Sequence, residues 1–320
     1  MKRDGKDHGG GIIVRATSLI VVMGLASKLT GLIRDSVIAR QFGATGTTDA
    51  YVVAGTIPTL VFSVITGALS VAVIPVFTGY LAAGEEAKGW RVFAGVTNWL
   101  AVGLGVLTLA GMSAAAVLVH LVAPGFAPQE RALAGRLTQI MFPVLLFSGM
   151  SNLFTGLSNA NNIFGVPAAA TVANNLVIIA AALLSTRFGI AGLAAGTAAA
   201  MAVAALVQLP PLFRAGFRFR RGFAWRDPAL GRLAALMIPV AVGLSANQGY
   251  ILIDRILAST LAPGSLSALN YAQKVMLVPV ALFITALGTA AYPTLARQVA
   301  AARLDEWRDT FWRVLRVTFW

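Results

Sequence analysis

The chain has 320 residues, of which 58% are hydrophobic and 12% charged, and its mean hydropathy of +0.78 is too apolar for a soluble domain. Its net charge of +13 comes from basic residues that cluster between apolar segments, which is typical of cytoplasmic loops facing anionic lipid and argues against a nucleic-acid partner. The absence of cysteine excludes disulfides and cysteine-based metal or nucleophilic sites.

The sequence predicts an all-α polytopic membrane protein, because a bilayer crossing takes about 20 apolar residues and eight stretches reach that length. In chain order, the predicted spans cover residues 16–41, 49–81, 91–122, 131–158, 164–187, 189–213, 229–259 and 266–299. The positively charged start of the chain precedes no convincing cleavage site, so the first span is expected to be uncleaved. The loops after even-numbered spans carry most of the loop arginines and lysines, which predicts a cytoplasmic N-terminus.

The first predicted span carries charged residues where a simple anchor would have none. Lys28 and Arg34 lie six positions apart, about 120° around a helix, so both could line one broad cavity. Asp35 follows Arg34 directly, and Asp49 begins the second span. One interpretation is a basic cavity for an anionic substrate, since charges inside a membrane normally face a partner or water. The other is a structural Arg34–Asp35 pair, with Lys28 extending to the membrane surface.

Two stretches resemble each other at a spacing of about 220 residues. MGLASKLTGLIRDSVIAR, from Met23, aligns with VGLSANQGYILIDRILAS, from Val242, and this places Asp254 opposite Asp35. Repeated helical bundles are a transporter device. We therefore expect a complete six-helix lobe at residues 1–213, a basic cytoplasmic linker at 214–228, and a partial C-terminal lobe at 229–320 that holds helices 7 and 8 and the start of helix 9.

Two longer motifs carry a family resemblance. SKLTGLIRDSVIARQFGATGTTDAYVVAGTIP at 27–58 and PGSLSALNYAQKVMLVPVALFITALGTAAYPTLAR at 263–297 closely resemble the MurJ (MviN) lipid II flippases of the MOP exporter superfamily. The resemblance implies a MOP-type bundle of two six-helix lobes around a central cavity in the bacterial cytoplasmic membrane. It also implies export of undecaprenyl-pyrophosphate-linked peptidoglycan precursor by alternating access. Because the family is longer, we expect the chain to be C-terminally incomplete, and a monomer is the default expectation.

The resemblance also assigns roles to individual residues. Lys28 stands where the family has arginine, while Arg34, Asp35 and Asp49 match as they stand. Phe62 and Gln273 depart from the pattern of some members. The full set of expected substrate-binding residues is Lys28, Arg34, Asp35, Asp49, Arg255, Asn270 and Lys274. Asp254 matches a carboxylate that binds Na⁺ in some members, so Na⁺ is a possible coupling ion, and no other cofactor is expected.

Other functions remain as alternatives. An exporter of another polyprenyl-linked saccharide, or a drug/cation antiporter of the same superfamily, would share the fold, although a drug pump would favour acidic cavity residues. A truncated, inactive membrane protein or a scaffold is a third interpretation. An enzyme is the weakest, since neither an acidic metal site nor a large extramembrane domain is visible in the sequence.

Overall fold

The computed structural model describes residues 7–220, 222, 227–300 and 303–319. Within these ranges, the side chains of residues 7–21 and 278–290 and of some single positions, Phe62 among them, lie outside the description. The described residues form ten helices and no strand. The helices are α1 (Asp7–Phe42), α2 (Gly46–Ala82), α3 (Glu86–Ser113), α4 (Ala115–Val122), α5 (Pro128–Met141), α6 (Pro143–Ala160), α7 (Gly165–Arg214), α8 (Pro228–Ala258), α9 (Ser265–Ala300) and α10 (Leu304–Phe319).

Six apolar segments of the described residues are long enough to cross a membrane, which confirms the polytopic all-α class. These segments are α2, α3, α5 with α6, the two halves of α7, and α8. They coincide with the second to seventh predicted spans. Helices α1 and α9 occupy the first and eighth, and each includes positions whose side chains are outside the description.

The spans differ from straight helices at particular residues. The predicted third span ends its main helix at Ser113 and turns into the short α4, while Pro143 begins α6 directly after α5. The fifth and sixth spans are two helices that meet at Gly189, and the label α7 covers both. Gly196 of the second helix lies against Ala181 of the first, so the two helices pack side by side. Gly189 has φ of 61° and ψ of −162°, a conformation that only glycine adopts readily. The short connection predicted between these spans is therefore a single-residue break.

The chain divides into two compact units, Met1–Ser267 and Ala268–Trp320. The first unit contains α8 as well as the six predicted spans of the N-terminal lobe. The proposed lobe boundaries at residues 213 and 229 rest on the sequence repeat and remain a prediction.

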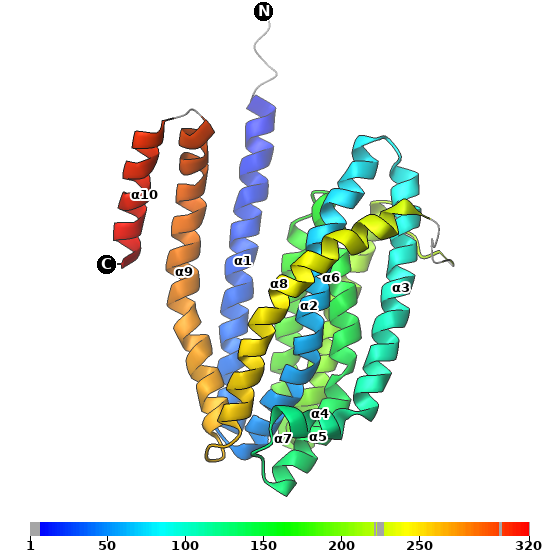
Figure 1. The fold of residues 1–320 in the computed structure, drawn as a ribbon, viewed down its shortest axis with the longest axis vertical. Helices are drawn as coiled ribbons and strands as arrows, with labels where there is room; N and C mark the ends of the chain where they lie inside the picture. The colour runs from blue at the N-terminus through cyan, green and yellow to red at the C-terminus, as the bar shows by residue number, and fades with distance from the viewer. Residues whose placement is uncertain (1–6, 221, 223–226, 301–302, 320) are drawn as a thin grey trace, which may run out of the picture. The chain divides into compact units, whose positions relative to one another are not determined.

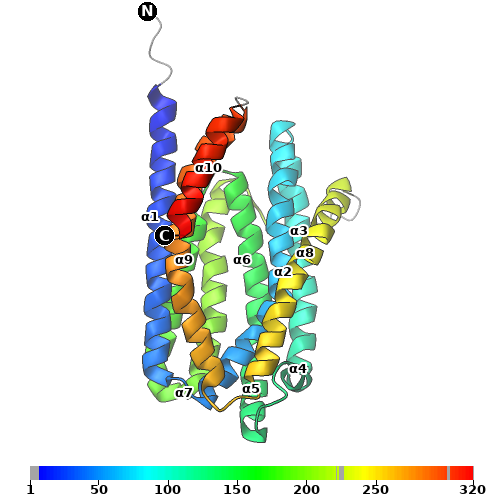
Figure 2. The same cartoon turned by 60° about the vertical axis from the view of Figure 1, so that its left-hand side comes forward.

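In the first unit, α2 packs against α3, α5, α6 and α8, and α7 packs against both α1 and α6. Figures 1 and 2 show α8 running obliquely across α2. A cluster of edge-to-face aromatic rings fills the core where α2, α3 and α6 meet the start of the predicted linker. Phe77 contacts Trp90 and Phe93, and the fully buried Phe217 contacts Trp90 and Phe154. Phe217 thus fixes the first residues of the linker to the bundle.

Candidate functional site

Arg34 is held by two neighbours. Its Nε and Nη2 atoms donate to Oδ1 of Asp35 at 3.0 and 2.9 Å, and its Nη1 donates to Oδ1 of Asn175 on α7 at 2.9 Å. Asn175 in turn donates to the carbonyl of Ser27 and to Oγ1 of Thr30. The amide of Asn175, which is 3% exposed, therefore bridges α7 to α1 and orients the guanidinium.

The Arg34–Asp35 ion pair forms as the structural interpretation of the sequence predicts, but the pair remains partly accessible to solvent. The two side chains keep 25% and 18% of their surface exposed. A guanidinium that is held in place and partly accessible can offer N–H donors to a phosphate. The geometry is compatible with the predicted role of both residues, and that role remains a prediction.

Lys28 lies at the edge of a cavity of about 590 Å³ between α1, α6 and α7. This Lys28 cavity is lined by Gly24, Ser27, Lys28, Ser148, Ser151, Asn152, Thr155, Pro167, Ala168, Ala170, Thr171, Asn174, Met201 and Ala204. No carboxylate is among these lining residues, and eight of the 14 have polar side chains. Lys28 and Arg34 therefore lie on neighbouring turns of α1, and the polar Lys28 cavity is next to the lysine.

Asp49 is buried and bound to backbone groups, whereas a substrate-binding residue would face an open cavity. It is 2% exposed, and its carboxylate accepts the backbone N–H groups of Gly264 and Ser267, both at 2.6 Å. These groups lie at the first turn of α9, where backbone donors have no partner within the helix. Asp49 thus caps α9 from the start of α2, and we call this contact the Asp49 cap.

The turn before α9 fits closely against the rest of the first unit. Gly264 has φ of +93°, and a Cβ at this position would lie 2.4 Å from the carbonyl oxygen of Ala44. The backbone N–H of Gly125, in the turn before α5, donates to Oγ of Ser259 at the end of α8. Three turns, α1–α2, α4–α5 and α8–α9, therefore meet at the end of the bundle opposite the start of α1 (Figure 1).

Asp254, which lies opposite Asp35 in the predicted repeat, forms a second ion pair with its neighbour Arg255. Nη1 of Arg255 donates to Oδ2 of Asp254 at 3.2 Å. Arg255 is 6% exposed, and its Nε is buried without a hydrogen-bond partner among the described groups. The described residues contain no group of three or more His, Cys, Asp or Glu side chains that could hold a metal. The assignment of Asp254 to a Na⁺ site remains a prediction.

Asn270 and Lys274 lie on α9 in the second unit, six and ten residues after Gly264. Both side chains are partly exposed. The remaining predicted residues, Lys28, Arg34, Asp35, Asp49 and Arg255, belong to the first unit. Their shared role with Asn270 and Lys274 therefore remains a prediction.

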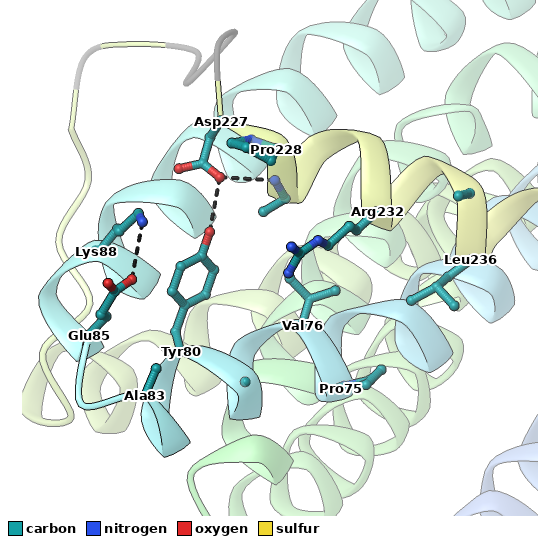
Figure 3. A pocket seen from close by; sticks show the side chains of 13 residues that line it. Pro75, Val76, Tyr80, Ala83, Glu85, Lys88, Asp227, Pro228, Arg232 and Leu236 are labelled. Atoms are coloured by element: carbon teal, nitrogen blue, oxygen red, sulfur yellow. Dashed lines mark hydrogen bonds and ion pairs between the residues drawn. The ribbon is translucent and has the colours of Figure 1, made fainter.

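A second cavity, of about 680 Å³, lies between the end of α2 and the start of α8 (Figure 3). Oδ1 of Asp227 accepts both the hydroxyl of Tyr80 and the backbone N–H of Ala229 at 2.9 Å, so it caps α8 and ties that helix to α2. Lys88 pairs with Glu85 on the opposite wall. Because opposite charges are mixed here, this cavity serves the packing of α8 better than it serves an anionic ligand.

Sequence reasoning missed the α7 side of the site. Asn174 and Asn175 are adjacent, but neighbouring residues of a helix point about 100° apart, so Asn175 reaches Arg34 while Asn174 lines the Lys28 cavity. The sequence signal was present as two consecutive amides inside an apolar span. Without the neighbouring helices it could not be distinguished from ordinary interhelical hydrogen bonding.

Comparison with known proteins identifies the family. The model of the family described as lipid II flippase MurJ matches residues 38–320. The chain belongs to the MurJ family. Lipid II flippase MurJ of Burkholderia cenocepacia is 35% identical over 94% of this chain, and the probable lipid II flippase MurJ of Vibrio cholerae is 33% identical over 97%. The chain spans about three-fifths of the length of these relatives, 61% and 60% respectively.

Solved structures agree with this MurJ-family fold. A lipid II flippase MurJ in an inward closed conformation matches with a TM-score of 0.76 and 22% identity over 89% of this chain and 59% of its own. An outward-facing multidrug resistance MATE transporter of the MOP superfamily matches with a TM-score of 0.66 and 14% identity, over 96% of this chain and 68% of its own. The MOP-type bundle expected from the sequence is therefore confirmed, and the chain is a multi-pass membrane protein.

Proposed function

We propose that this MurJ-family chain forms the substrate-binding part of a lipid II flippase. Such a protein moves undecaprenyl-pyrophosphate-linked peptidoglycan precursor across the bacterial cytoplasmic membrane by alternating access. Its partners are the lipid-linked precursor and the surrounding lipids, its N-terminus faces the cytoplasm, and it acts as a monomer. Flipping breaks no covalent bond, so the proposal requires a transporter rather than an enzyme. The names of the relatives and the arrangement around Arg34 support it.

The observation that carries the proposal is the support of Arg34 from two helices. A charged group inside a membrane costs about 2.5–3.5 kcal/mol at the helix centre on insertion scales, so a retained cation normally has a partner or a function. Asp35 offsets the charge of Arg34 while the site is empty, and Asn175 fixes the third guanidinium nitrogen. A pyrophosphate carries more negative charge than one carboxylate, so it competes with Asp35 for the same donors. Lys28 adds a second cation on the same helix.

Transport also requires the site to open to each side in turn. The Asp49 cap holds the α8–α9 turn against the start of α2. A movement of this turn away from α2 during transport would break the two hydrogen bonds of the cap. Substrate can drive this change only if it binds the two states with different affinities. A Na⁺ ion bound at Asp254 is a further part of the proposal, and replacing Na⁺ by K⁺ in the transport assay tests it.

The test compares Arg34→Ala with Arg91→Ala, each expressed from its complete reading frame in bacteria depleted of their own lipid II flippase. Arg91 is an exposed arginine on α3 whose side chain donates to the carbonyl of Ala87, so it serves as a matched control. We expect Arg34→Ala to abolish growth rescue and precursor export while its membrane insertion stays normal. Arg91→Ala should rescue growth like the unmodified protein. Normal export by the Arg34→Ala variant would overturn the proposal.

An exporter of cationic drugs is disfavoured by the same site. Cationic substrates call for carboxylates in the binding cavity, and none lines the Lys28 cavity. An exporter of a different polyprenyl-linked saccharide would use the same cations. Export assays that compare lipid-linked precursors with different sugars separate these two substrates.

A further inference from the structure

The Lys28 cavity contains hydrogen-bonding groups that the protein itself does not use. Oγ of Ser148 and Nδ2 of Asn174 have no hydrogen-bond partner among the described groups, although their residues are only 1% and 6% exposed. A buried polar group left unpaired costs about 1–3 kcal/mol, so such groups in a cavity wall indicate a ligand or bound water. Ser148 comes from α6 and Asn174 from α7, so two helices contribute to the same feature.

Other polar groups around the cavity keep a hydrogen-bond donor or an acceptor that the protein does not use. Oγ of Ser151 accepts from Gln208, which leaves its hydroxyl proton available. Nδ2 of Asn152 donates to the carbonyl of Ser148, which leaves its Oδ1 available. Hydroxyl and amide side chains both donate and accept hydrogen bonds. The lining is therefore complementary to a ligand that does the same, rather than to a bare anion, which only accepts.

The charge and size of the cavity further restrict which class of ligand it can bind. With Lys28 at its edge and no carboxylate or imidazole among its lining residues, the cavity is a poor site for a metal cation. Its volume of about 590 Å³ lies within the range of small-molecule sites, about 300–1,000 Å³. Ala170, Met201 and Ala204 supply an apolar part of the wall, against which the C–H groups of a ring can pack. Sugars combine such ring faces with hydroxyl groups.

The cavity and Arg34 share helix α1, because Lys28 lines the cavity. Lys28 and Arg34 are six residues apart on α1, a rise of about 9 Å. The adjacent residues Asn174 and Asn175 connect the cavity to Arg34, because Asn174 lines the cavity and Asn175 accepts a hydrogen bond from Arg34. A pyrophosphate held by these two cations would have its sugar-bearing end beside the cavity.

We propose that the Lys28 cavity binds the sugar attached to the pyrophosphate, with Ser148 and Asn174 as hydrogen-bonding residues. The proposal rests on the proposed function, because it assigns a second part of the same lipid-linked substrate to this cavity. It makes the cavity the part of the site that distinguishes a glycosylated lipid from undecaprenyl pyrophosphate alone.

The test measures the affinity of the purified full chain, in detergent or nanodiscs, for two lipids: undecaprenyl pyrophosphate and lipid II. We expect Asn174→Leu and Ser148→Ala each to weaken lipid II binding about threefold to tenfold, the effect of one lost neutral hydrogen bond. Binding of undecaprenyl pyrophosphate should change by less than about twofold, because no described hydrogen bond joins either side chain to Lys28 or Arg34. Thr108→Val is the matched control, since its buried hydroxyl on α3 is also unpartnered but lies outside the cavity.

The outcomes separate this proposal from the proposed function. If the unmodified chain binds neither lipid, the proposed function fails. If it binds both and the cavity variants leave both affinities unchanged, or weaken both equally, the sugar assignment is overturned while the flippase proposal stands. Ser148→Ala removes a single oxygen atom, so it keeps the test decisive if Asn174→Leu does not fold.

Discussion

Replacing Asp49 by asparagine tests the Asp49 cap directly. The aspartate accepts two backbone N–H groups at 2.6 Å in a fully buried position. Hydrogen bonds to a charged group contribute about 1.5–3 kcal/mol each. Asparagine keeps one oxygen acceptor but turns an amide donor toward the other N–H, so one charged bond is lost and one buried donor is unpaired. The favourable charge at the helix N-terminus is also removed.

These terms give an expected loss of about 2–4 kcal/mol in the free energy of unfolding. For a chain of this size, the midpoint of thermal unfolding in detergent should fall by on the order of 5 °C. The chain lacks cysteine, so a cysteine introduced at Thr48, which is fully buried next to Asp49, provides a local probe. Labelling of Thr48→Cys by a water-soluble maleimide should be faster when Asp49→Asn is also present.

Glu85→Gln is the control for Asp49→Asn. Glu85 is also a carboxylate, but it is half-exposed in a surface pair with Lys88, and such a pair contributes about 0–1 kcal/mol. If Asp49→Asn lowers the unfolding midpoint no more than Glu85→Gln does, the cap does not stabilise the fold and the reasoning is refuted.

Three further variants probe other contacts. Gly264→Ala should lower the unfolding midpoint more than Asp49→Asn does, because it meets both a positive φ and a Cβ contact 2.4 Å from a backbone oxygen; equal stability with the unmodified protein would contradict this. Tyr80→Phe should cost about 1 kcal/mol in thermal unfolding, since it removes one hydrogen bond to Asp227, and an unchanged midpoint would show that this bond does not stabilise α8. Asn175→Leu should reduce lipid II binding about tenfold while Arg34 stays in place, and undiminished binding would show that Arg34 needs no support from α7.

The periodic and compositional signals of the sequence were sufficient for the membrane class and most spans. Apolar length identifies spans because a bilayer imposes it on every crossing helix. The break between the fifth and sixth spans was predicted next to Gly189, but the interruptions at Ala114 and Pro143 were harder to predict. The sequence contains an alanine and a proline there, and each occurs elsewhere inside a continuous helix, as Pro58 and Pro75 do in α2.

The candidate site was only partly predictable for a different reason. Charges inside a span are conspicuous, so Lys28, Arg34 and Asp35 could be selected without a structure. The cap formed by Asp49 depends on a turn more than 200 residues later in the chain. Asn175 and Ser148 gain their roles from neighbours on other helices, and no local pattern specifies which helices will be adjacent.

The two ion pairs between adjacent residues bear on how the protein is made. Arg34 and Asp35 follow each other in the chain, as do Asp254 and Arg255, so each pair can form as soon as its own helix does. A nascent α1 can therefore enter the membrane with these two charges already offset, before any later helix has been synthesised. Asn175 emerges 141 residues after Arg34 and binds a guanidinium whose charge is already balanced. The order of synthesis thus separates the two requirements on Arg34: neutralisation is local and early, and orientation comes late with the arrival of α7.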